Sequence, residues 1–124
     1  MSEPTAPAHH ARTAAESLLD LNVATLNPDA YTYPGDVHTT AQALKAMSER
    51  LPQGLDQLGA ALDRHAANGN IWMTDGRALD PALYAAREAL VIATVTARTL
   101  TAALASLSEH TASMGAPFPC EGGV

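Results

Sequence analysis

The side chains best suited to metal binding or proton transfer are five histidines and one cysteine, and their spacing builds no known site. Di-metal helical bundles place Glu-x-x-His pairs on facing helices, and this sequence contains no such pair. A single thiol, Cys120, can form neither an internal disulfide nor a cysteine-based metal cage. We therefore expect no metal and no cofactor. The histidines are His9, His10, His38, His65 and His110.

Motifs for nucleophilic or phosphate chemistry are also missing from the sequence. It contains no Gly-x-Ser-x-Gly elbow, no Gly-x-x-x-x-Gly-Lys phosphate loop and no Gly-x-Gly-x-x-Gly dinucleotide motif. The expectation is a protein without catalytic function of its own.

Charge and composition narrow the partners that the chain is expected to bind. The formal net charge is −6, and the seven Lys and Arg residues are scattered along 124 residues. DNA binding needs a basic stripe, and an anionic membrane surface needs a basic cluster, so neither partner is expected. Six of the seven cations are Arg, which together with abundant Ala indicates a GC-rich bacterial genome. The first residues lack the basic start and apolar run of a signal peptide, which predicts a cytoplasmic protein.

Helix signals organise the chain into a single all-α domain over residues 13–113. Hydrophobic residues make up 47% of the chain and are mostly Ala and Leu, so the core must consist of many small contacts between helices. Capping-box spacing at Thr13 and the Asp80-Pro81 pair mark two helix starts. Pro52 is expected either to kink the middle segment or to divide it. The expected elements are a flexible segment 1–12, helices 13–26, 37–50, 51–67 and 81–113, loops 27–36 and 69–80, and a disordered tail 114–124.

Two apolar stripes with alternating steps of three and four residues predict how the long helices pair. The stripe of the last helix is a heptad seam. Since the two helical segments are of similar length, we expect a long antiparallel hairpin with the first helix packed across it, a three- or four-helix bundle. The middle segment carries Ala41, Leu44, Met47, Leu51, Leu55, Leu58 and Leu62; the last helix carries Leu83, Ala86, Leu90, Ala93, Ala97, Leu100, Leu104 and Leu107.

Two polar side chains lie on or beside these stripes. His65 falls one step beyond Leu62, where we expect a hydrogen-bonded histidine at the end of the core, the alternative being a ligand. Arg98 lies beside the seam and is expected to be solvated, or else to pair with a carboxylate of another helix or subunit.

The middle of the last helix carries a second apolar patch away from its seam, formed by Val91, Ile92 and Val95. A helix that is apolar nearly all round is buried on several sides. Either it is the central helix of its own bundle, or the patch is a subunit or partner interface. A transmembrane helix is a third interpretation, but Arg98 would lie at its middle, where insertion costs about 2.5–3.5 kcal/mol.

Large apolar residues also occur in both loops. Trp72 lies between Ile71 and Met73 in the second loop, and Tyr31 lies in the first. Such residues either plug an end of the bundle or anchor a partner. If the two loops meet, Tyr31, Trp72 and Met73 form a candidate small-molecule pocket.

The expected hairpin is similar in length and topology to small secreted proteins of actinobacteria that carry Trp-x-Gly at the hairpin turn. The turn here reads Trp72-Met73-Thr74, without the glycine. Their Tyr-x-x-x-Asp/Glu secretion signal follows the hairpin, whereas the matching spacing here, from Tyr84 to Glu88, lies inside the last helix. The resemblance implies a secreted helical hairpin as an alternative and assigns no family.

The sequence thus predicts a small protein that binds another protein or itself, most simply as a homodimer. Its candidate contact residues are Val91, Ile92, Val95 and Trp72. A ligand-binding bundle with a pocket near Trp72 and Tyr31 is the alternative from another functional class.

Overall fold

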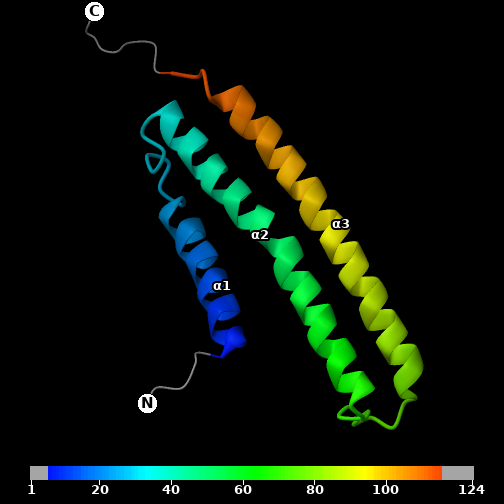
Figure 1. Ribbon diagram of the computed structural model, residues 1–124. Coiled ribbons are helices and arrows are strands. Elements are labelled where there is room, and N and C mark those ends of the chain that lie inside the picture. The colour runs from blue at the N-terminus through cyan, green and yellow to red at the C-terminus, as the bar shows by residue number, and fades with distance from the viewer. Residues whose placement is uncertain (1–5, 116–124) are drawn as a thin grey trace, which may run out of the picture.

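The described part of the computed structural model, residues 6–115, folds into three α-helices without strands: α1 (Pro7–Ala24), α2 (Pro34–Ala67) and α3 (Leu79–Thr111). Helices α2 and α3 run antiparallel and side by side as a long hairpin (Figure 1). At 1.5 Å per residue each spans about 50 Å. The all-α prediction and the helical hairpin are confirmed.

Helix α1 begins earlier than its capping signal predicts. Its first residue is Pro7, a position where the missing N–H of proline costs no helix hydrogen bond. The helix therefore starts six residues before the predicted range 13–26, within the segment 1–12 that was expected to be flexible. Residues 1–5 and 116–124, which include Cys120 and most of the expected tail, lie outside the described residues.

Helix α2 passes through Pro52 as one continuous helix, so the proline does not divide it. Its start is fixed by Asp36, whose carboxylate accepts the backbone N–H of Tyr33 at 3.0 Å. Pro52 removes one backbone donor, the partner of the Ser48 carbonyl. Contacts with α3 lie on both sides of this point, at Ser48 and Gly59.

A constant register pairs α2 with α3. From His38 to Ser48 to Gly59 along α2, the contact on α3 moves back from Thr111 to Thr101 to Leu90 by the same number of residues. Small side chains line this seam, and the buried hydrophobic residues of the described chain are only Ala41, Leu83 and Ala97. Narrow residues let the two helices approach closely, but they leave most of the large apolar side chains outside the seam.

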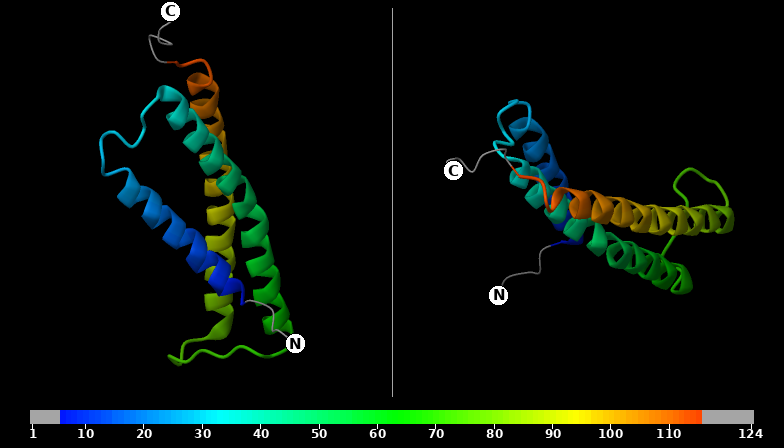
Figure 2. Two further views of the ribbon diagram at one scale, coloured as in Figure 1. Left: turned by 90° about the vertical axis from the view of Figure 1, so that its left-hand side faces the viewer. Right: turned by 90° about the horizontal axis from the view of Figure 1, so that it is seen from above.

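Helix α1 does not pack across the hairpin, and this part of the bundle prediction is wrong. None of its residues is buried, and its Cα atoms stay more than 8 Å from those of α2 and α3. Figure 2 shows α1 as an arm that leaves the hairpin at the first loop. Local bonds order that loop: the Thr25 hydroxyl donates to the Leu21 carbonyl, and the Asn27 side chain accepts from the Asp29 N–H.

The result is an open molecule. One arm, α1, and one narrow seam between α2 and α3 leave large apolar side chains exposed on each of the three helices.

Candidate interaction surface on the third helix

Helix α3 faces α2 with a heptad seam, called here the inner seam. Its residues combine Leu and Ala with four hydroxyl side chains, which the predicted seam did not include. The prediction was right for Leu83, Leu90, Ala97 and Leu104. It was wrong for Leu100 and Leu107, which are exposed beside the contact. The inner seam comprises Leu83, Leu90, Thr94, Ala97, Thr101, Leu104, Ser108 and Thr111.

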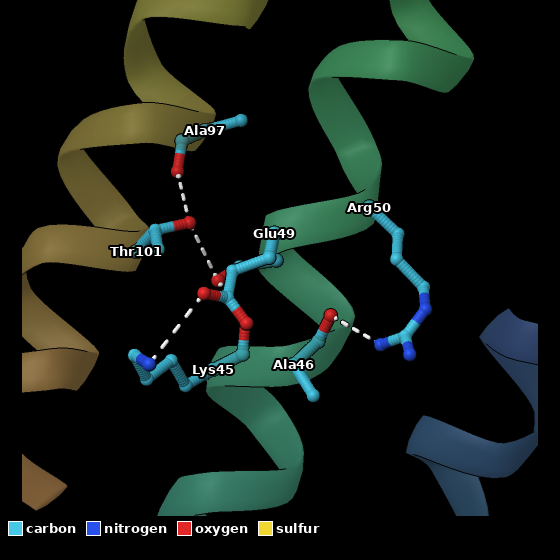
Figure 3. Close-up of polar contacts among 7 residues, drawn as sticks. Lys45, Ala46, Glu49, Arg50, Ala97 and Thr101 are labelled. Carbon is cyan, nitrogen blue, oxygen red and sulfur yellow. Dashed lines mark hydrogen bonds and ion pairs between the residues drawn. The ribbon is translucent and has the colours of Figure 1, made fainter.

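A part-buried hydroxyl pair, Ser48 with Thr101, joins the two helices at the middle of the hairpin; Figure 3 labels Thr101 with the carbonyl partners Lys45 and Ala97. Ser48 is fully buried, and its Oγ lies 2.8 Å from Oγ1 of Thr101. The same two oxygens approach the carbonyls of Lys45 at 2.8 Å and Ala97 at 3.0 Å. These three contacts share only two hydroxyl protons. When one hydroxyl donates to the carbonyl of its own helix, the other must donate to that hydroxyl and not to its own carbonyl. The pair therefore couples α2 to α3 directly.

A second polar contact joins the helices at the open end of the hairpin. Nδ1 of His38 lies 2.9 Å from Oγ1 of Thr111, and that hydroxyl donates to the Leu107 carbonyl at 2.9 Å. Whether the imidazole or the hydroxyl donates in this contact depends on the tautomer of His38, and either arrangement joins α2 to α3. Sequence reasoning missed both contacts, although His38, Ala41 and Ser48 follow the same three-and-four spacing as the apolar residues.

A second seam, offset by one residue and here called the outer seam, runs along α3 beside the first. The exposed fractions of Tyr84, Val91 and Val95 are 64%, 63% and 57%. Ile92, 65% exposed, lies next to it. The predicted interface residues Val91, Ile92 and Val95 therefore lie together on the surface, and they are not buried in a bundle. The outer seam comprises Tyr84, Glu88, Val91, Val95, Arg98 and Ala102, at steps of four and three, and every one of them is exposed.

Threonine hydroxyls on α3 bond back to their own helix. Thr94, Thr96 and Thr99 donate to the carbonyls four residues earlier at 2.8, 2.7 and 3.0 Å. This local bonding satisfies the hydroxyl donors within the helix itself. On the exposed side of α3, Thr96 and Thr99 therefore need no acceptor from another chain.

The outer seam carries two charges that have no ion-pair partner within residues 6–115. Glu88 and Arg98 both lie outside the ion pairs of the described chain. The interhelical ion pair is Asp63–Arg87 instead, at 2.8 Å and largely exposed. Arg98 borders an open groove with Glu49 and Asp56 of α2, without pairing with either. The expectation of a solvated Arg98 matches this position.

The structure does not bring the predicted pocket residues together. Tyr31 lies in the loop between α1 and α2, and Trp72 and Met73 lie in the turn between α2 and α3, at the opposite end of the hairpin (Figure 1). Trp72 is 75% exposed, so it does not cover the end of the hairpin. Its neighbours Ile71 and Met73 are half-buried. No small-molecule pocket is assembled from these residues.

The histidines do not form a site either. His65 is exposed, so its predicted place at the end of the core is wrong. It lies on the flank of α2, while the contact with α3 runs through Gly59. Among residues 6–115, no three His, Cys, Asp or Glu side chains gather as metal ligands.

Helix α3 is long and apolar enough by composition to cross a membrane. An 18-residue window within Leu79–Thr111 has a mean hydropathy of 1.6 and is only 6% buried. A single helix of this kind is weak evidence for a membrane span, but its exposure shows that α3 is not the enclosed core of this chain.

No family model, no curated protein and no solved structure matches this chain.

Proposed function

We propose that the protein acts by binding another protein chain, and most simply a second copy of itself, through the outer seam of α3. The observation that carries the proposal is the exposure of Val91, Ile92 and Val95 in the middle of a long, well-formed helix. Contiguous exposed apolar residues on a soluble protein mark an interaction site. The proposal assigns no catalytic activity and a cytoplasmic location.

Replacing Val91 and Val95 together with Glu tests this function. Both side chains are exposed in the single chain, so the helix should keep its circular-dichroism signal. Native mass spectrometry over a range of concentrations should show a dimer for the wild type and a monomer for the variant. Loss of helical signal in V91E/V95E would instead make these residues part of the fold.

The matched control is the pair Leu19→Glu and Val23→Glu on α1. These residues have the same spacing and similar exposure, 60% and 58%. The proposal expects this control to remain a dimer. If the control dissociates and V91E/V95E does not, association occurs through α1 and the proposal is wrong.

A secreted helical hairpin is a second candidate, and the topology of α2 and α3 with Trp72 in the turn favours it. Its test is cellular location. Detection of the tagged protein in culture supernatant, with a cytoplasmic marker retained in the cells, would replace the cytoplasmic part of the proposal.

A further inference from the structure

The outer seam of α3 is self-complementary when it is reversed. Read from Tyr84 to Ala102, its six positions are Tyr, Glu, Val, Val, Arg and Ala. Placed against the same seam running in the opposite direction, Tyr84 faces Ala102, Glu88 faces Arg98 and Val91 faces Val95. A two-fold symmetric interface requires this property, because if residue i contacts j, then j contacts i.

We infer that the occupant of the outer seam is the α3 helix of a second copy, packed antiparallel and centred between Val91 and Val95. This inference rests on the proposed function and adds the partner, the direction and the register. The Glu88 carboxylate of one copy pairs with the Arg98 guanidinium of the other, twice by symmetry.

Charge and size both favour this register. Neither Glu88 nor Arg98 has an ion-pair partner within the described chain, and the reversed seam supplies one for each. The largest side chain of the seam, Tyr84, meets the smallest, Ala102, so the helices can pack at even separation. A parallel pair would instead place each Glu88 against Glu88 and each Arg98 against Arg98, and like charges repel.

The dimensions of the seam set the strength of the dimer. From Tyr84 to Ala102 it is about 27 Å long, and one helix is about 10 Å wide. A strip of this size lies at the low end of specific interfaces, below about 1200 Å² in total. The dimer should therefore dissociate on dilution. The charges of Glu88 and Arg98 should determine the direction and register of the two helices.

Charge exchange tests the register. The single variants E88R and R98E each place like charges opposite one another, and each should raise the dimer Kd about tenfold at low salt. The double variant E88R/R98E restores opposite charges and should return the Kd to near the wild-type value. Mixed together, the two single variants should form a heterodimer in preference to either homodimer.

Matched controls are E16R and R12E on α1, which change the net charge equally at exposed positions and should leave the Kd unchanged.

The antiparallel direction of the two helices is tested with the variants Y84C and A102C, each made with C120S to remove the chain's own thiol. Oxidising the mixture should give the heterodisulfide, since residues 84 and 102 of one chain are about 27 Å apart.

The outcomes separate this inference from the proposed function. Dissociation by V91E/V95E, without rescue in the double charge variant, overturns the register and keeps the function. A protein that stays monomeric at every concentration overturns this inference together with the self-association part of the proposed function, and leaves only binding to a different protein chain. Co-flotation of such a monomer with phosphatidylcholine vesicles would assign α3 to a membrane.

Discussion

The two seams of α3 occupy neighbouring positions on one helix and differ in the polar groups they carry. The inner seam is covered by α2 and combines three Leu and Ala97 with four hydroxyl side chains, with Ala97 and Thr101 at its middle. One residue further along, the outer seam exposes Val95 and Arg98. The Ser48–Thr101 hydroxyl contact joins the inner seam to α2, while Tyr84, Val91 and Val95 of the outer seam remain uncovered. Size and hydrophobicity alone therefore do not decide which face of this helix is the core.

The largest expected effect compares the adjacent residues Leu83 and Tyr84. Leu83 is buried at 8% exposure, so Leu83→Ala should lower the free energy of unfolding by about 2–5 kcal/mol at any protein concentration. Tyr84→Ala should lower it only where the dimer forms, because binding stabilises by mass action. Urea unfolding at two concentrations, a hundredfold apart, measures both. Equal losses at both concentrations for Tyr84→Ala would place it in the core.

The part-buried hydroxyl pair should give the next largest effect. Ser48→Ala and Thr101→Val should each cost about 1 kcal/mol of unfolding free energy, because each removes one member of a hydrogen-bonded pair. The double variant should cost less than the sum of the two, since it leaves no unpaired hydroxyl. A double-mutant cycle in urea measures the coupling. Additive losses would mean that the two hydroxyls do not interact.

Two glycines of α2 test how closely the inner seam is packed. Gly54 has nothing within 4 Å of an added Cβ, so Gly54→Ala should stabilise the helix by about 0.5–1 kcal/mol. At Gly59 an added Cβ would lie 3.4 Å from Cδ1 of Leu90, which should remove part of that gain. Thermal unfolding of both variants shows the difference. Equal gains would indicate a looser seam at Leu90.

The smallest expected effect concerns the ion pair between Asp63 and Arg87. Both side chains are about half exposed, so Asp63→Asn should change the unfolding free energy by no more than about 1 kcal/mol. The loss should shrink further in 0.5 M salt, because salt screens exposed charges. Chemical denaturation at two salt concentrations checks this. A loss that is large and independent of salt would show that the pair is more enclosed.

The sequence predicted the helices and their pairing far better than the face on which they pair. Periodicity and the Asp80-Pro81 signal place α3 within two residues of its observed ends. The seam was harder to assign because the rule used was hydrophobicity, which selected Leu100 and Leu107 over Thr101 and Ser108. At Thr101 the contact includes a hydrogen bond to Ser48, and residue types alone do not report such a bond.

The candidate site was predicted in part for a related reason. Val91, Ile92 and Val95 stood out as apolar residues away from the seam, and their exposure agrees with an interface. Tyr31 and Trp72 were grouped on the possibility that two loops meet. The two residues lie at opposite ends of α2, which is one uninterrupted helix. The sequence did not show this separation, because Pro52 left open whether the segment was one helix or two.

The threonines of α3 that bond back to their own helix also change what its outer surface demands of a partner. Because Thr96 and Thr99 keep their donors occupied, any surface that covers them needs to supply no acceptor. Covering this side of the helix therefore leaves no hydroxyl donor without an acceptor. Donors that are satisfied within the helix do not select one neighbouring surface over another. Recognition is then left to the side chains that still need a counterpart, Glu88 and Arg98.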